Sequence, residues 1–225
     1  MMTRTKLRDR VLPNYTRGEE IFNMVSHIVG GAFGILALVL CVIKGVWNQS
    51  VMQVVTSSIY GSSLILLYTM SSVYHGLRPN MGKKVMQVID HCTIYYLIGG
   101  TYTPIVLCGI ACKYPGWGWS IFGIVWGLCV LGTVFTAIDL KKYKKLSMLC
   151  YIGIGWCIVI ALKPTIMSIS FEAFLLILAG GIGYTLGAVL YGLGSKHQYI
   201  HSVFHLFVLL GSVLQFLAIY IYVLI

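Results

Sequence analysis

Seven long apolar runs divide the chain, and no other feature of the sequence constrains its fold as strongly. They lie near residues 21–44, 50–75, 87–110, 116–138, 146–163, 171–193 and 201–224. A helix needs about 20 predominantly apolar residues to cross a bilayer, and each run is close to that length. Strands of a membrane barrel are shorter and alternate polar with apolar residues. The runs therefore predict an all-α polytopic membrane protein, a bundle of seven transmembrane helices.

The composition excludes the main alternatives to a membrane protein. Hydrophobic residues make up 58% of the chain and charged residues 10%, against about 25% charged residues in an ordinary soluble domain. A water-soluble monomer would lack the polar surface it needs, and an intrinsically disordered chain would be far less hydrophobic. The seven cysteines lie almost wholly inside the apolar runs, without metal-type CxxC spacing. We interpret them as small hydrophobic residues.

The basic residues predict how the helices are oriented. Of the 16 Lys and Arg residues, 13 fall in the arm before the first run and in alternate loops, and Lys44, Lys113 and Lys163 fall on the other side. Because Lys and Arg concentrate in cytoplasmic loops, we expect a cytoplasmic N-terminus and an external C-terminus. We divide the chain into a basic cytoplasmic arm, 1–20, and a transmembrane domain, 21–225. The arm and the KKYKK run at 141–145 are expected to lie against anionic lipid headgroups, and no nucleic-acid partner is expected because the chain offers no base-reading fold.

All six histidines fall at the predicted cytoplasmic ends of the helices. His197, His201 and His205 have i, i+4, i+8 spacing, which places three imidazoles on one face of the last helix. An i, i+4 pair lies about 6 Å apart along a helix axis, a spacing that suits chelation of one metal ion. Elsewhere, Ser71 and His75 share the i, i+4 relation.

Asp90, beside His91, is an acid well inside an apolar run. An unneutralised carboxylate there would be costly, and a nearby cation would explain its presence. Three neutral histidines with a water form the open ligand set of a catalytic zinc site, in which an acid such as Asp90 accepts a proton or holds a ligand in place. Less specific readings stay open: His197 as a headgroup contact, and Asp90 as a helix cap or a partner of Lys83 or Lys84. The first helix adds a polar stripe at the same depth: Glu20, Asn23, Ser26 and His27.

Four motifs together resemble a known family. They are E-x-x-N-x-x-S-H (20–27), S-S-x-Y-H (71–75), D-H-x-x-I-Y (90–95) with G-T-Y-T-P (100–104), and H-x-x-x-H (201–205). Their order and spacing resemble the bacterial hemolysin III branch of the progestin and adipoQ receptor superfamily, over nearly the whole chain. The resemblance implies a multi-pass protein of the bacterial plasma membrane, with seven helices and a zinc ion near the cytoplasmic face.

The resemblance also implies roles for individual residues. By motif position the zinc ligands are His75, His201 and His205, with Asp90 near the metal-bound water and Ser71 one turn before the first ligand. Three histidines are additional to the receptor-branch pattern, and His27 and His91 either stand behind the ligands or replace one of them. The residues expected around the ligands, or as alternatives to them, are His27, His91, His197, Glu20, Asn23 and Tyr74.

Three functions compete at this point. The superfamily includes alkaline ceramidases with a similar Ser/Asp/His set, which implies zinc-dependent hydrolysis of a lipid amide or ester, with membrane lipids as partners and substrate and a role in membrane lipid homeostasis. The hemolysin III name implies a cytolysin or pore-former, although the spans are too apolar to line a wide aqueous channel. The third function is a sensor in which zinc only staples helices together.

Overall fold

The computed structural model describes residues 5–193 and 197–225, and these residues form helices and connecting loops without a strand. Seven helical segments are long and apolar enough to cross a membrane, which confirms the predicted fold class. The helices are α1 (Arg17–Trp47), α2 (Val51–Gly76), α3 (Met81–Pro104), α4 (Pro115–Ile138), α5 (Lys144–Gly155), α6 (Leu162–Ser168), α7 (Phe171–Leu193) and α8 (Ile200–Leu217). The third and seventh spans continue as the π-helical segments Ile105–Ile110 and Ala218–Val223.

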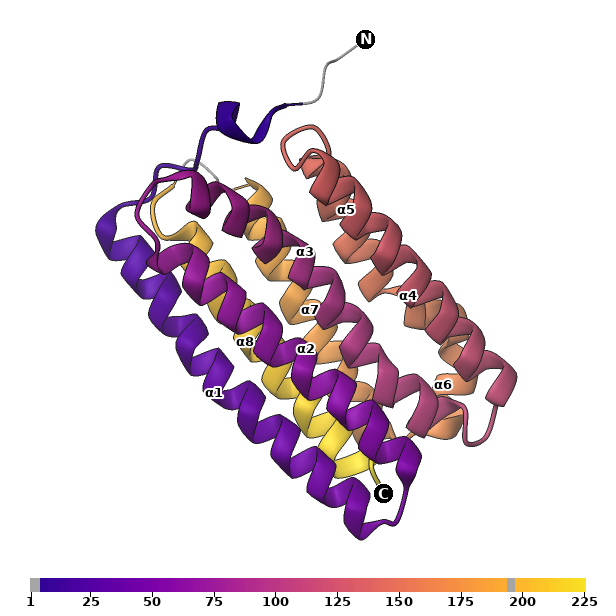
Figure 1. The fold of residues 1–225 in the computed structure, drawn as a ribbon. Coiled ribbons are helices and arrows are strands. Elements are labelled where there is room, and N and C mark those ends of the chain that lie inside the picture. The colour runs from indigo at the N-terminus through magenta and orange to yellow at the C-terminus, as the bar shows by residue number, and fades with distance from the viewer. Residues whose placement is uncertain (1–4, 194–196) are drawn as a thin grey trace.

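The helices run roughly parallel or antiparallel to one another, with the two described termini at opposite ends of the bundle (Figure 1). α1 packs along α2 and also contacts α8, α2 packs on α3, α3 on α4, and α7 on α8. α3 is the most enclosed of the spanning helices. The end of the bundle that carries the N-terminus is called the N-terminal end below.

The fifth span is broken, which the apolar pattern over 146–163 did not predict. α5 ends at Gly155, a 3-10 segment covers Cys157–Ala161, and α6 continues to Ser168. The Tyr102 hydroxyl donates to the Gly155 carbonyl at 2.7 Å and accepts the Ile158 N–H at 2.9 Å. Pro164 is compatible with the first turn of a new helix but would break the interior of a continuous one. Two backbone groups freed by the break are therefore satisfied by a side chain from α3.

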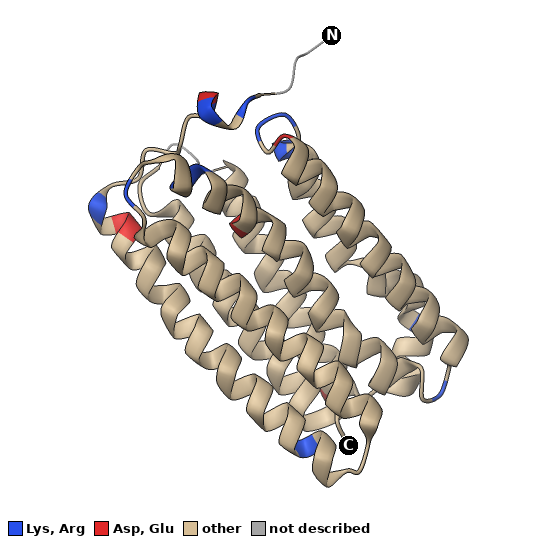
Figure 2. Cartoon of the chain, in the orientation of Figure 1, with Lys and Arg blue, Asp and Glu red and all other residues tan. Residues whose placement is uncertain are grey.

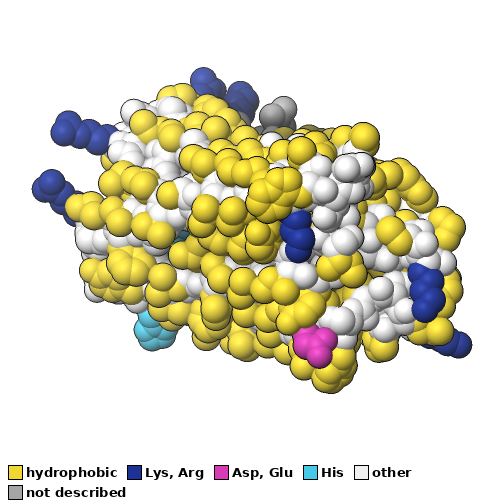
Figure 3. Space-filling view, turned by 90° about the horizontal axis from the view of Figure 1, so that it is seen from below, with side chains coloured by type: hydrophobic (Ala, Val, Ile, Leu, Met, Phe, Trp, Pro, Cys, Tyr) yellow, Lys and Arg dark blue, Asp and Glu magenta, His cyan; other side chains and the backbone are white. Residues whose placement is uncertain are grey.

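The surface fits a lipid environment. Figure 3 shows hydrophobic side chains over most of the face in view, and in Figure 2 the bundle between its two ends carries few charges. Lys and Arg gather mainly at the N-terminal end (Figure 2), the end that the charge bias assigns to the cytoplasm. All seven cysteines are free, in agreement with their interpretation as small hydrophobic residues.

The basic arm folds back across the N-terminal end of the bundle. The Thr5 N–H donates to Oδ2 of Asp139 at 2.7 Å, and the Lys84 ammonium donates to the Arg8 carbonyl at 2.6 Å. Arg10 is buried. Burial alone would raise the pKa of the Asp139 carboxyl, but hydrogen bonds from the Thr5 and Lys142 N–H groups and the nearby Arg10 guanidinium outweigh it and lower the pKa. The arm is thus packed on protein at several points along its length.

Candidate metal centre

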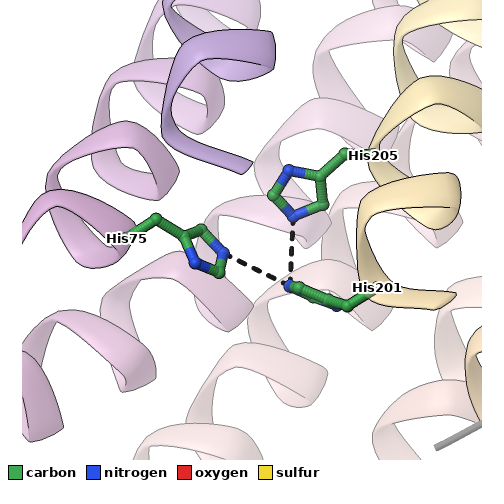
Figure 4. A group of neighbouring side chains, drawn as sticks. All are labelled: His75, His201 and His205. Carbon is green, nitrogen blue, oxygen red and sulfur yellow. Dashed lines mark hydrogen bonds between the residues drawn. The ribbon is translucent and has the colours of Figure 1, made fainter. Parts of the chain in front are cut away.

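Three histidines converge inside the N-terminal end of the bundle. His75 comes from the last turn of α2, and His201 and His205 come from the first two turns of α8. Nε2 of His201 lies 3.3 Å from Nε2 of His75 and 3.1 Å from Nε2 of His205. The rings point toward one another (Figure 4), and one nitrogen from each lies within 4.8 Å of the other two. We call these three residues the histidine cluster.

A carboxylate fixes the orientation of the first histidine. Oε2 of Glu20, on α1, lies 2.7 Å from Nδ1 of His75, and Oε1 of Glu20 accepts a hydrogen bond from the Lys83 ammonium at 2.7 Å. The Lys83 ammonium also donates to the Leu77 carbonyl at 2.9 Å. With the Nδ1 proton directed at Glu20, Nε2 of His75 carries the lone pair and faces the cluster. This is the arrangement that metal-ligating histidines usually have.

The donor set fits a tetrahedral metal ion. Nitrogen ligands about 2.0–2.1 Å from zinc at tetrahedral angles lie about 3.3–3.4 Å apart. The Nε2 atom of His201 lies 3.1 Å from that of His205 and 3.3 Å from that of His75, close to this value, and the third pair of ligand nitrogens lies within 4.8 Å. Three buried imidazoles, with carboxylates close by, are also a ligand type that suits zinc and other transition metals.

The histidine cluster borders a cavity of about 430 Å³. His201 and His205 line it, and so do Ser71 of α2 and Asp90 of α3. The remaining lining is mostly apolar and comes largely from α3, α5, α7 and α8, with Leu67 of α2 and His27 of α1. The structure therefore brings the predicted serine, the predicted acid and two of the predicted histidines to the wall of one cavity. The rest of that wall is mostly apolar and suits a hydrocarbon chain.

Asp90 has a different neighbour from the two lysines considered as partners. Its Oδ2 lies 3.5 Å from Nδ1 of His91, whose Nδ1 is also 2.8 Å from the Gln87 carbonyl oxygen and donates to it. Lys83 pairs with Glu20, and Lys84 contacts the arm. Asp90 thus faces the cavity beside His91.

His197 does not share a helical face with His201 and His205. α8 begins at Ile200, and Tyr199 before it has a positive φ of 61°, in the left-handed region. This turn interrupts the helical register that the i, i+4, i+8 spacing predicted. His197 lies outside the helix and is exposed.

The other predicted neighbours lie around the cluster. The His27 ring lies parallel to the His205 ring with centroids 3.7 Å apart. Asn23, one turn earlier on α1, is fully buried, and its side-chain amide has no hydrogen-bond partner among the described residues. Tyr74 is buried beside His75, with ring centroids 4.6 Å apart.

The sequence analysis gave one residue of the centre another partner and did not include a second. It considered Lys83 only as a partner of Asp90, whereas the Lys83 ammonium pairs with Glu20. Tyr15 falls in the arm that we expected to lie against lipid headgroups, yet its ring is stacked on the ring of His201 with centroids 5.0 Å apart. Burial raises the pKa of Tyr15, and Tyr191 and Tyr74 raise it further, so its phenol is neutral at physiological pH. The capping box that follows Tyr15, Thr16 with Glu19, was the available sign that the arm is ordered there.

The fold and the site together define a multi-pass integral membrane protein with a buried three-histidine centre at one end. The family model described as "Haemolysin-III related" matches residues 15–216, and the chain belongs to that family. It is 38% identical to Hemolysin-3 of Bacillus cereus over 206 residues, 92% of each chain. It is 36% identical to the Hemolysin-3 homolog of Bacillus subtilis (strain 168), over 92% of this chain and 96% of the relative. A more distant relative is the human Monocyte to macrophage differentiation factor, 25% identical over 75% of this chain and 70% of that protein.

Proposed function

We propose that the chain is a zinc-dependent hydrolase of lipid amides or esters, working at the cytoplasmic leaflet. One observation carries the proposal: two members of the histidine cluster, Asp90 and Ser71 line the same largely apolar cavity. A purely structural metal site would not need an acid and a hydroxyl on a cavity wall. A few polar groups that converge in a largely apolar pocket are the usual arrangement of a ligand-binding or active site.

In this proposal His75, His201 and His205 hold the metal. Zinc bound in this way supplies Lewis acidity, which polarises a carbonyl group and makes water a better nucleophile at neutral pH. The Asp90 carboxylate accepts the proton that water loses on attack and returns it to the leaving amine or alcohol. The Ser71 hydroxyl, buried on the cavity wall, donates a hydrogen bond to the oxygen on which negative charge develops.

The cavity accounts for the expected substrate class. Its lining is dominated by apolar side chains such as Leu67, Ile94 and Leu97, which contact an acyl chain favourably and exclude water from the reacting bond. Lys144 and Lys145, at the start of α5, also line it. These lysines place the polar part of a lipid near the N-terminal end of the bundle. The acyl chain then lies along the apolar body of the cavity.

The test combines metal analysis with lipid turnover. Protein purified in detergent should contain about one zinc per chain and should release fatty acid from a short-chain ceramide or acyl ester. His201→Ala should lose both metal and turnover, whereas Asp90→Asn should keep the metal and lose turnover. His197→Ala is the matched control, because His197 is exposed and outside the cluster. Full turnover by metal-stripped protein would refute the mechanism.

The same experiment separates two competing functions. His75 lies on α2 and the other two histidines lie on α8. In the first competing function, a metal bound by all three has a purely structural role and links these two helices. In that case zinc loss lowers the unfolding temperature, and no lipid is hydrolysed by wild-type protein. A cytolytic function, as the names of the Bacillus relatives state for those proteins, would produce discrete conductance steps from purified protein in planar bilayers, unaffected by His201→Ala.

A further inference from the structure

The three histidines of the cluster differ in whether their second ring nitrogen has a hydrogen-bond partner. A histidine that binds a metal usually donates its second ring N–H to a carboxylate, a carbonyl or water, which fixes the ring. His75 has such a partner in Glu20. Nδ1 of His201 and of His205 has no hydrogen-bond partner among the described residues, although the main chain of Asn23 approaches His205. Aromatic rings stacked on these two histidines are the described contacts that can orient them.

We propose that Tyr15 and His27 are positioning residues that hold His201 and His205 by ring stacking. The inference rests on the proposed metal site, because it concerns how the ligands of that site are oriented. The rings of Tyr15 and His201 are stacked with centroids 5.0 Å apart and an interplanar angle of 11°. Those of His27 and His205 are stacked at 3.7 Å, also at 11°.

His27 is itself fixed from behind. The ring of Tyr68 on α2 meets it edge-on, with centroids 5.0 Å apart and an angle of 82°. Tyr68 packs against Gly30, where an added Cβ would lie 2.4 Å from the tyrosine ring. The Tyr68 hydroxyl donates to Ser212 Oγ of α8 at 2.8 Å. His27 is therefore held between Tyr68 and His205, and it is not among the three histidines whose nitrogens converge.

Tyr15 is fixed by the start of α1. Thr16 caps the helix and forms a capping box with Glu19. Oε1 of the same Glu19 accepts the Tyr199 N–H at 2.7 Å, so the arm is tied to the residue just before α8. This contact keeps Tyr15 in register with His201, on the first turn of that helix. The arm thus contributes a residue to the site, in addition to its positive charge.

Three aromatic rings contact His201 at different angles. Tyr15 lies nearly parallel to the His201 ring, whereas Tyr191 of α7 approaches it at 5.1 Å with a tilt of 53°. Phe204 lies 5.8 Å away at 27°. An aromatic pair contributes stabilising free energy beyond that of the surface area it buries. If that free energy is lost from the metal-binding state, zinc affinity falls by about 3- to 10-fold. The stacking role requires an aromatic ring at positions 15 and 27. It does not require the hydroxyl of Tyr15 or the ring nitrogens of His27.

The distinguishing experiment is a zinc titration of the metal-stripped protein against a competing chelator dye. Tyr15→Ala and His27→Ala should weaken zinc binding by about 3- to 10-fold each. Tyr15→Phe and His27→Phe should retain most of the wild-type affinity, because stacking is kept. Val11→Ala, in the exposed part of the arm, and Ile28→Ala, exposed on α1, are matched controls that should change nothing.

A second measurement does not depend on metal binding. In metal-free protein, NMR relaxation of the His Cε1 positions should show a more mobile His201 ring in Tyr15→Ala and a more mobile His205 ring in His27→Ala. If His27→Phe binds zinc as weakly as His27→Ala, the imidazole itself is required and the stacking role is wrong. Unchanged ring mobility in both alanine variants also overturns the proposal. Failure of wild-type protein to bind zinc refutes the proposed metal site, while the mobility comparison still decides the role of Tyr15 and His27.

Discussion

Oε2 of Glu20 on α1 lies 2.7 Å from Nδ1 of His75 on α2, which makes the carboxylate the partner that sets the tautomer of the first histidine. Loss of such a partner typically lowers metal affinity by about 10- to 100-fold. We therefore expect Glu20→Ala to weaken zinc binding by about that factor, measured by chelator competition. Glu172→Gln, on the exposed start of α7, is the control. Wild-type affinity in Glu20→Ala would show that the contact does not support the site.

Lys83 and Glu20 form an ion pair in which the lysine is almost fully buried and the glutamate side chain is 20% exposed. Removing one partner of a buried pair leaves an uncompensated charge, which costs about 3–5 kcal/mol. Lys83→Met should accordingly destabilise the protein by about 3 kcal/mol, the lower end of that range, because Glu20 reaches solvent. The double variant Lys83→Met with Glu20→Gln should be more stable than Lys83→Met alone in chemical unfolding. Additive losses in the double variant would contradict this coupling.

Tyr102 satisfies two backbone groups at the break between α5 and α6. Tyr102→Phe keeps the ring but leaves the Gly155 carbonyl and the Ile158 N–H without that partner. An unsatisfied buried group costs about 1–3 kcal/mol, so the unfolding temperature should fall by several degrees. Tyr96→Phe, on the exposed side of the same helix, should leave it unchanged. Equal unfolding temperatures for the two variants would mean that the break does not depend on Tyr102.

Asp139 gives the arm a pH-dependent anchor. Its carboxyl pKa is lowered in the folded protein by the Thr5 and Lys142 N–H groups. A lowered pKa contributes stability above the unfolded value of about 3.9, and that contribution is lost as the pH falls through the folded pKa. Limited proteolysis should therefore release the arm of wild-type protein at pH values below about 4. Asp139→Asn should release it equally at pH 7 and at low pH, and a protected arm in Asp139→Asn at pH 7 would contradict the prediction.

The fold class followed from the sequence because it depends on one local property. Each span must supply about 20 apolar residues to cross the bilayer, and all seven spans were located from this requirement. The break after Gly155 was not visible, because the residues around it are as apolar as a continuous helix. What allows the break is the Tyr102 hydroxyl, which belongs to a helix more than 50 positions earlier in the chain.

The candidate site divides in the same way. The sequence by itself determined which groups enter the apolar part of the chain: an HxxxH pair on the last span, His75, Asp90 and Ser71. It could do so because polar side chains in a bilayer are costly and therefore few. Only the tertiary structure decided that His197 stands apart, that Lys83 pairs with Glu20, and that Tyr15 covers His201. Those relations depend on a left-handed turn and on contacts between distant helices, and the spacing of residues along one chain carries no information about either.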